Sequence, residues 1–291
     1  MGGNLICPKC RSISVVKNGM GHTKVQHYKC NECDYNFPIT ILNKVKTLIF
    51  DIENAPVEAY VWNKRVWNTS ISPKQLKHDW FMLTWSAKWL NSPKTYSFKL
   101  TPKEAKERND ERITKALWNL FDEANIIIAH NAWRFDIPMA NTKFIIHKLN
   151  PPSPYQIIDT LKIAKKIGSF TYNSLDFLGE TLGLGRKIET EFQLWVDCVN
   201  GKASALKEMA EYNIQDVILL EEVYLRLRGW MNSHPNLNLF QNESGCSHCG
   251  SMKIKYAGEY AAQTRTFKSF RCLDCGGFSR ETKKSYVSTA R

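Results

Sequence analysis

The chain has 291 residues, which is enough for one large α/β domain and smaller modules. Its formal net charge of +12 favours a polyanionic partner, and its 43% hydrophobic residues indicate a globular protein. No stretch approaches the roughly 18 continuous apolar residues of a membrane span, and the N-terminus lacks the apolar run of a secretory signal. These features argue against an integral membrane protein, and we expect a cytoplasmic location.

Two C-x-x-C pairs open the chain and are separated by 19 residues. Such pairs are typical of a tetrahedral zinc site, because each presents two thiolates from one tight turn. Strand-like segments at 13–17 and 25–28 lie between the pairs, as a zinc ribbon requires. We therefore predict a zinc ribbon over residues 1–44, with these four ligands: Cys7, Cys10, Cys30 and Cys33.

The next segment, KTLIFDIE from Lys46, alternates like a strand and places Asp51 and Glu53 on one face. Neighbouring buried carboxylates repel each other unless a cation or a proton compensates them. A strand end exposed to solvent would also tolerate both acids, so this motif alone leaves the choice open. We expect the tryptophans that follow to lie mostly in the core: Trp62, Trp67, Trp80, Trp85 and Trp89.

A second motif follows the β-rich run 126–129 and reads HNAWRFDIPMA. Pro138 suits the first turn of a helix, so the pattern predicts a helix that begins near Asp136. A carboxylate at a helix start can be a simple cap as well as a metal ligand. For this motif alone both interpretations stay open.

The third motif, YNIQD, lies in a long segment whose apolar residues recur at helical spacing. Tyr212 and Asp216 are four residues apart, so they project from the same helix face and can meet one ligand. A surface hydrogen bond between the two side chains is the alternative.

Two further C-x-x-C pairs, 22 residues apart, predict a second zinc ribbon within residues 232–291, with strands at 253–256 and 266–271. Its four predicted ligands are Cys246, Cys249, Cys272 and Cys275. Disulfides are the alternative for both modules, but they need an oxidising compartment, to which nothing in the sequence directs the chain. Cys198, the ninth cysteine, is expected to be a small core residue.

The order D-x-E, N-x3-F-D and Y-x3-D resembles the DEDDy branch of the RNase H-like exonucleases, especially YprB-like and polymerase proofreading domains. The resemblance spans residues 45–231 and implies an α/β fold with a mixed sheet. It makes Tyr212 the residue that positions the attacking water and assigns two Mg²⁺ or Mn²⁺ ions to four ligands: Asp51, Glu53, Asp136 and Asp216. Four further residues are candidates for contacts with the substrate: Asn54, Asn131, Trp133 and Phe135. Many relatives carry Thr or Ser where this chain has Asn54, so its role is open.

The N-terminal module, from CPKC to CNECDYNF, resembles the zinc ribbons at the start of insertion-sequence transposases. The DEDDy resemblance implies a two-metal-ion 3′-to-5′ exonuclease. Mg²⁺ or Mn²⁺ suits such a site, because hard divalent ions prefer carboxylate and phosphate oxygens. The two ribbons, with one structural Zn²⁺ each, would help to hold nucleic acid, DNA more than RNA. An endonuclease or junction resolvase on the same scaffold and a non-catalytic nucleic-acid-binding protein are the alternatives.

Overall fold

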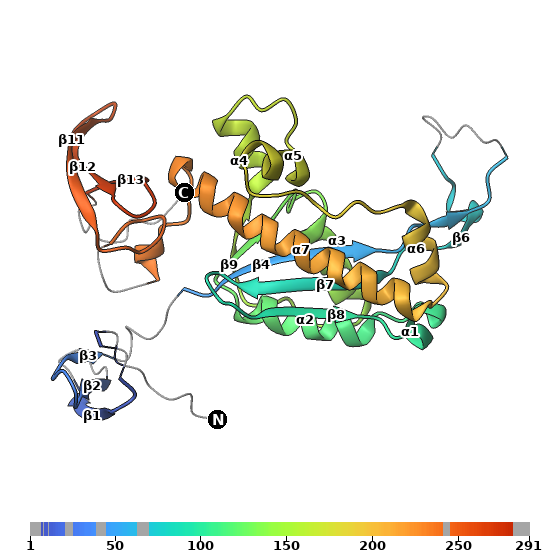
Figure 1. The fold of residues 1–291 in the computed structure, drawn as a ribbon, viewed down its shortest axis with the longest axis horizontal. Coiled ribbons are helices and arrows are strands. Elements are labelled where there is room, and N and C mark those ends of the chain that lie inside the picture. Colours follow the sequence, from blue (N-terminus) through green and yellow to red (C-terminus); the bar gives the residue numbers. More distant parts are fainter. Residues whose placement is uncertain are drawn as a thin grey trace. The chain divides into compact units, whose positions relative to one another are not determined.

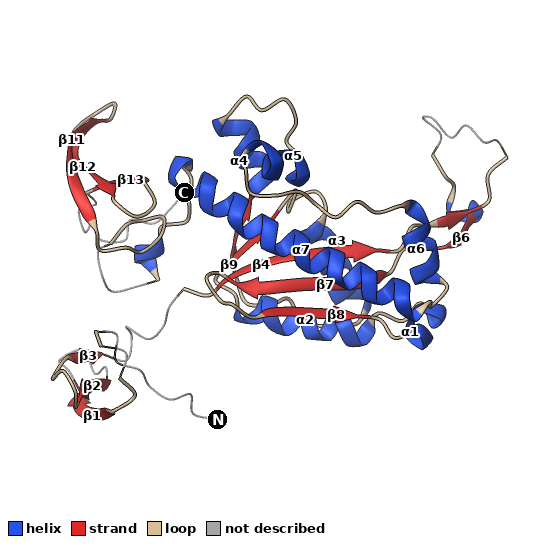
Figure 2. Cartoon of the chain, in the orientation of Figure 1, coloured by secondary structure: helices blue, strands red, loops and turns tan. Residues whose placement is uncertain are grey.

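The structure is a computed structural model that describes residues 7, 9–10, 12–20, 26–38, 45–62, 70–240 and 245–281. The chain divides into two compact units, Lys46–Leu227 and the remainder, Met1–Val45 with Arg228–Arg291. Within the described residues, no helix combines the length and apolarity needed to cross a membrane. Figures 1 and 2 show the fold of each unit.

A five-stranded mixed sheet forms the centre of the unit Lys46–Leu227, in the order β10-β9-β4-β7-β8. β4 runs parallel to β9 and antiparallel to β7, and β9 runs parallel to β10. This sheet confirms the predicted mixed α/β architecture. The strand bounds are β4 Thr47–Asn54, β7 Met82–Trp89, β8 Thr95–Lys99, β9 Ile126–Ala129 and β10 Gln156–Asp159.

Helices pack on the sheet, and the longest of them, α7, crosses it (Figure 2). Phe50 on β4 packs edge-to-face on Phe121 of α2, with ring centroids 4.9 Å apart. Asp51, the next residue, accepts a hydrogen bond from Asn213 of α7, so alternate residues of β4 contact different helices. The helix bounds are α1 Pro102–Glu107, α2 Glu111–Glu123, α3 Asp136–Ile146, α4 Thr160–Ile167, α5 Leu175–Thr181, α6 Phe192–Val199 and α7 Ala203–Leu227.

A nearly buried ion pair ties α7 to the sheet. Lys88 of β7 pairs with Glu221 of α7, and Glu221 also accepts the Asn91 backbone N–H at 2.9 Å. Both charges therefore have partners, and removing either one would leave the other buried without compensation. The pair fixes how α7 lies over β7, which in turn sets where the residues of α7 meet β4.

The tryptophan prediction is right only in part. Trp85 is completely buried and its indole N–H donates to the Ile113 carbonyl at 2.7 Å, while Trp80 and Trp89 are half-buried. Trp62, however, is 95% exposed, and the core prediction for it is wrong. It lies just beyond β5 Glu58–Ala59, which pairs with β6 Leu76–His78 in a two-stranded arm separate from the five-stranded sheet. The 3₁₀ turn Pro73–Gln75 immediately precedes β6. Trp67 lies outside the described residues.

Each cysteine-rich segment forms a three-stranded antiparallel sheet. The observed strands overlap the predicted ones, although β1 begins two residues later than expected, because the Val15 N–H bonds back to the Ile13 carbonyl in a tight turn. Cys198, in α6, is completely buried, as predicted. The remaining bounds are β1 Val15–Met20, β2 Gln26–Cys30, β3 Asn36–Pro38, β11 Ile254–Ala261, β12 Thr266–Cys272 and β13 Phe278–Arg280, with 3₁₀ turns at Arg228–Trp230 and Leu237–Leu239.

Candidate active site

Three carboxylates from distant parts of the sequence meet between β4 and α7. Asp51 and Glu53 project from β4, and Asp216 projects from α7 and is completely buried. One oxygen of each side chain lies within 4.8 Å of an oxygen of the other two. Their acidic groups therefore form one cluster, a geometry that a divalent cation could bind through oxygen ligands.

Asp136 stands at the start of α3 and is 1% exposed. It is not a simple cap, because the N-cap position is Phe135 and no side-chain cap hydrogen bond forms there. Both Asp136 carboxylate oxygens are buried without a hydrogen bond to another described residue. A buried, unpartnered carboxylate is costly, so its position also fits a cation.

Burial raises the pKa values of all four acids, and repulsion within the group adds to the effect for Asp51, Glu53 and Asp136. Burial first, and the charge of Asp216 next, raise the pKa of Asp51 to about 7. Burial and the charge of Asp51 raise the pKa of Glu53 to about 8. Burial likewise raises the pKa of Asp136 well above its usual range and that of Asp216 above 3.8. Positive charge placed among these oxygens would relieve the repulsion, and an all-oxygen donor set suits Mg²⁺ or Mn²⁺.

Tyr212 lies one helical turn before Asp216 on α7, and its hydroxyl accepts a hydrogen bond from Lys187 Nζ at 3.0 Å. Burial raises the pKa of Tyr212 to about 12. The side chain is therefore a neutral phenol near pH 7, able to orient a hydrogen-bonded group but not to act as an anionic base.

Three residues that contact the clustered acids were not among the site residues predicted from the sequence. Asn213 donates its side-chain N–H to Asp51 Oδ2 at 2.6 Å, a hydrogen bond from Trp195 lowers the pKa of Glu53, and Lys187 Nζ lies 2.6 Å from Asp216 Oδ2. Only Asn213 carried a usable signal, since it lies three residues before Asp216 and so projects from the same helix face. Lys187 and Trp195 reach the cluster from the segment before α6 and from α6 itself, where no periodicity points to it.

The second motif presents aromatic rings near Asp136. Trp133 is 51% exposed and Phe135 is 39% exposed, and Lys162 Nζ lies 5.3 Å from the centre of the Trp133 ring. An exposed ring beside a lysine is suited to stacking on a base while the ammonium meets a phosphate.

Asp159, at the end of β10, holds this loop in place. It is 3% exposed and accepts the backbone N–H groups of Asn131 at 3.1 Å and Trp133 at 3.3 Å, together with two N–H groups at the start of α4. Asn131 adopts a left-handed backbone conformation with φ of 71°, which asparagine tolerates better than most residues. Asn131 therefore shapes the loop through its backbone.

Asn54, the last residue of β4, follows Glu53 at a break in the pairing register with β7. Its amide nitrogen and oxygen are both buried and have no hydrogen-bond partner among the described residues.

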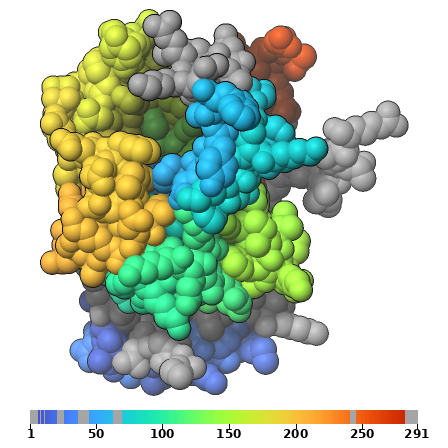
Figure 3. Space-filling model, turned by 90° about the vertical axis from the view of Figure 1, so that its right-hand side faces the viewer, coloured from blue at the N-terminus to red at the C-terminus, as the bar shows by residue number. Residues whose placement is uncertain are grey.

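Figure 3 shows a recess in this unit, bordered by blue-to-cyan segments from the region of the arm and by yellow-to-gold segments that lead into α6.

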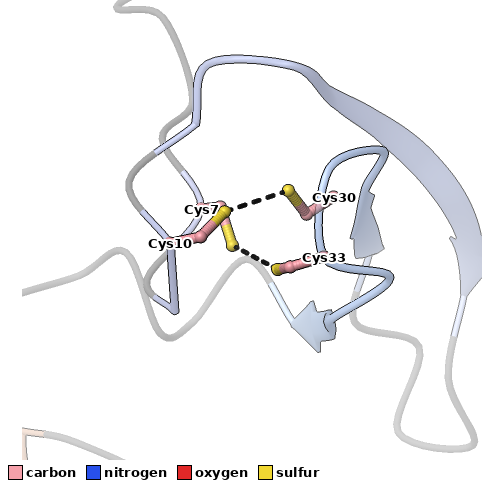
Figure 4. A group of neighbouring side chains, drawn as sticks. All are labelled: Cys7, Cys10, Cys30 and Cys33. Carbon is pink, nitrogen blue, oxygen red and sulfur yellow. Dashed lines mark hydrogen bonds between the residues drawn. The ribbon is translucent and has the colours of Figure 1, made fainter.

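The four cysteines of each ribbon also converge. In the N-terminal ribbon, Cys7 Sγ lies 3.6 Å from Cys33 Sγ, and Cys10 Sγ lies 3.5 Å from Cys30 Sγ (Figure 4). In the C-terminal ribbon the corresponding distances are 3.5 Å for Cys246 with Cys275 and 3.6 Å for Cys249 with Cys272.

A tetrahedron of thiolates at the usual Zn–S distance has edges of about 3.8 Å, whereas a disulfide needs about 2.05 Å. All nine cysteines are free thiols. Both four-cysteine clusters could therefore hold a metal ion, consistent with zinc ribbons.

Comparison with known proteins identifies the family of the unit Lys46–Leu227. A family model described as the RNase H superfamily matches residues 80–228, a segment that contains Asp136, Tyr212 and Asp216. Among solved structures, the family B DNA polymerase from the hyperthermophilic archaeon Pyrobaculum calidifontis is similar, with 14% sequence identity and a TM-score of 0.46. The match covers 69% of this chain and 27% of the polymerase. No curated protein matches the chain. On the family match, the chain belongs to the RNase H superfamily.

Proposed function

We propose that the chain is a divalent-metal-dependent exonuclease that removes nucleotides from the 3′ ends of nucleic acid, DNA in preference to RNA. Membership of the RNase H superfamily supports nuclease activity on nucleic acid. The observation that carries the proposal is the convergence of Asp51, Glu53 and Asp216 within 4.8 Å. Asp136 is not part of that group, but its buried carboxylate has no hydrogen-bond partner among the described residues, and the charge of Asp51 helps to raise its pKa. The proposed 3′-to-5′ polarity rests on the resemblance of the three motifs to those of DEDDy exonucleases.

In this proposal the four carboxylates hold two Mg²⁺ or Mn²⁺ ions. Bound together, such ions lower the pKa of an attacking water and offset the charge that grows on the phosphate during an in-line displacement. Asn213 keeps Asp51 in position through its 2.6 Å hydrogen bond. The neutral Tyr212 hydroxyl orients the attacking water, since its raised pKa prevents it from serving as an anionic base.

The substrate strand would meet the exposed face of the second motif. Trp133 and Phe135 offer rings to the terminal bases, and Lys162, close to Trp133, offers charge to the backbone. The unpaired amide of Asn54 follows Glu53 but is buried, so it would reach the sugar of the last nucleotide only after neighbouring groups move aside. These contacts supply affinity for an unpaired end, while the carboxylates supply the chemistry.

The two ribbons, assigned to residues 1–44 and 232–291, would each fold around one Zn²⁺ and add affinity for the nucleic acid, with the nuclease domain at 45–231. Small modules of this size gain most of their folding free energy from the metal. A Cys246→Ser variant should therefore lose one equivalent of zinc and bind DNA more weakly, while the cleavage rate at saturating DNA stays close to that of the wild type. A cleavage rate reduced as strongly as the binding would count against this division of labour.

The decisive experiment uses linear DNA and RNA labelled at the 5′ end and closed circles labelled internally, all incubated with Mg²⁺ or Mn²⁺. We expect a ladder of products shortened from the 3′ end of linear strands, closed circles that stay intact, and no activity without added metal. Asp216→Asn should abolish cleavage, whereas Asp197→Asn, which changes an acid that pairs with Lys202 away from the cluster, should retain it.

Rapid cleavage of circles would support an endonuclease instead of an exonuclease. Binding without cleavage by the wild-type protein would support a non-catalytic nucleic-acid-binding protein.

A further inference from the structure

Lys187 brings a positive charge into the carboxylate cluster from the connection between α5 and α6. Its Nζ lies 2.6 Å from Asp216 Oδ2 and 3.0 Å from the Tyr212 hydroxyl. The Lys187 side chain is 28% exposed and the Asp216 side chain is completely buried, so this is not a solvated surface pair.

The backbone around Lys187 is held separately from its side chain. The Lys187 N–H donates to Asp176 Oδ1 at 2.8 Å, and the neighbouring Arg186 pairs with Asp176 and Glu180 at 3.3 Å and 3.5 Å. The backbone can therefore stay in place while the four-carbon stem of the lysine rotates. Movement of the ammonium requires no refolding of the connection.

We infer that Lys187 is a built-in counter-ion of the carboxylate cluster, which competes with a divalent metal ion for Asp216. The inference rests on the proposed metal site, because Asp216 is one of its ligands there. An ammonium at hydrogen-bond distance from Asp216 Oδ2 takes up one of the positions from which that oxygen can bind a metal. A metal ion that approaches the same oxygen must displace the ammonium or accept a like charge beside it.

The charge of Lys187 acts on Asp51 and Glu53 as well as on its direct partner Asp216. Its charge lowers the pKa values of Asp51, Glu53 and Asp216, opposing the effect of burial on each of them. Lys187 therefore stabilises the cluster without metal and disfavours the addition of a second cation. These two effects make opposite predictions for stability and for metal affinity, and both can be measured without cleavage.

The test is isothermal titration of Mn²⁺ into the full chain with its zinc retained and no nucleic acid present. Lys187→Met keeps the length of the side chain and removes its charge, so we expect it to bind Mn²⁺ about tenfold more tightly, since like charges a few ångströms apart repel strongly at a partly buried site. Lys187→Arg keeps the charge and should bind Mn²⁺ within about twofold of the wild type. Lys202→Met removes a lysine that pairs with Asp197 outside the cluster and should leave the affinity unchanged.

Thermal unfolding supplies the second readout. Lys187→Met should melt below the wild type without Mn²⁺ and reach the wild-type midpoint at saturating Mn²⁺, because the tighter-binding variant gains more from the ion. Lys187→Gln, which can still donate a hydrogen bond to Tyr212, serves if the Met variant does not fold. Unchanged or weaker Mn²⁺ binding by the neutral variants would overturn the inference and assign Lys187 a purely structural role.

The outcome is separable from that of the proposed function. Tighter Mn²⁺ binding by Lys187→Met in a protein that cleaves no nucleic acid would support the counter-ion and refute the nuclease proposal. Metal-dependent cleavage by the wild type, with equal Mn²⁺ affinities for the wild type and Lys187→Met, would support the nuclease proposal and refute the counter-ion. A wild-type protein that binds no Mn²⁺ at the carboxylates would refute both.

Discussion

Replacing Glu53 by Gln removes one of the acidic groups that the fold brings together in the carboxylate cluster. Burial first, and the charge of Asp51 next, raise the pKa of Glu53 from 4.5 to about 8. The folded protein therefore favours the neutral form of a group that is ionised at pH 7 in the unfolded chain. Glutamine has nearly the same shape and is always neutral, so the Glu53→Gln protein should be the more stable one when no divalent metal is bound.

The size of the effect follows from the two pKa values. At pH 7 the unfolded chain gains about 3 kcal/mol by ionising Glu53, whereas the folded chain gains almost nothing because its pKa lies above 7. Glu53→Gln removes that difference. For a domain of this size, 1 kcal/mol corresponds to roughly 2 to 4 °C in the unfolding midpoint, so we expect a rise of roughly 6 to 12 °C.

The effect should depend on pH in a defined direction. Because the pKa of Glu53 is higher in the folded chain than in the unfolded chain, the wild-type protein loses stability as the pH rises from about 4.5 to about 8. The advantage of the variant should therefore shrink to less than about 1 kcal/mol at pH 5 and be largest near pH 8. Bound Mn²⁺ should reverse the order, since the wild type offers the ion a charged ligand and gains more stability from it.

The assay is urea and thermal unfolding at pH 5, 7 and 8, on protein dialysed without chelator so that the ribbons keep their zinc. Glu222→Gln, an exposed acid on α7, is the matched control and should change stability little at any pH. A Glu53→Gln protein that is less stable than the wild type without Mn²⁺, or whose advantage does not vary with pH, would refute the account of the cluster as repelling charges.

Three further substitutions test other parts of the structure. Tyr212→Phe should slow single-turnover cleavage by about 10² while Mn²⁺ binding stays unchanged; an unchanged rate would remove Tyr212 from the mechanism. Trp133→Ala should raise KM about fivefold or more at nearly constant kcat, since stacking on an aromatic ring contributes ~1 to 3 kcal/mol per base; a fall in kcat alone would contradict a binding role. Asp110→Ala removes the buried partner of Lys143 at 2.9 Å and of the Met82 N–H at 2.8 Å. Urea unfolding should show that the free energy of unfolding falls by about 3 to 5 kcal/mol, and a fall below about 1 kcal/mol would contradict a stabilising role for Asp110.

Local chemistry in the sequence was sufficient for several conclusions. The alternation in KTLIFDIE placed Asp51 and Glu53 on one face because successive strand residues point to opposite sides. The separation of four residues placed Tyr212 and Asp216 one turn apart on α7. The spacing of the C-x-x-C pairs predicted two four-cysteine clusters, because each pair needs only a tight turn. Each of these inferences depends on the geometry of a single element or turn.

Tertiary structure decided the rest, because it depends on how elements pack. Lys187 and Trp195 reach the cluster through an irregular connection and a short helix, whose paths follow from contacts with the sheet and α7 and not from any local period. Trp62 was misplaced for the same reason, since its apolar ring predicts burial but its backbone belongs to an arm that leaves the sheet. The sequence alone therefore singled out the three acids that converge, Asp51, Glu53 and Asp216, and the packing of α7 on β4 decided which other groups lie beside them.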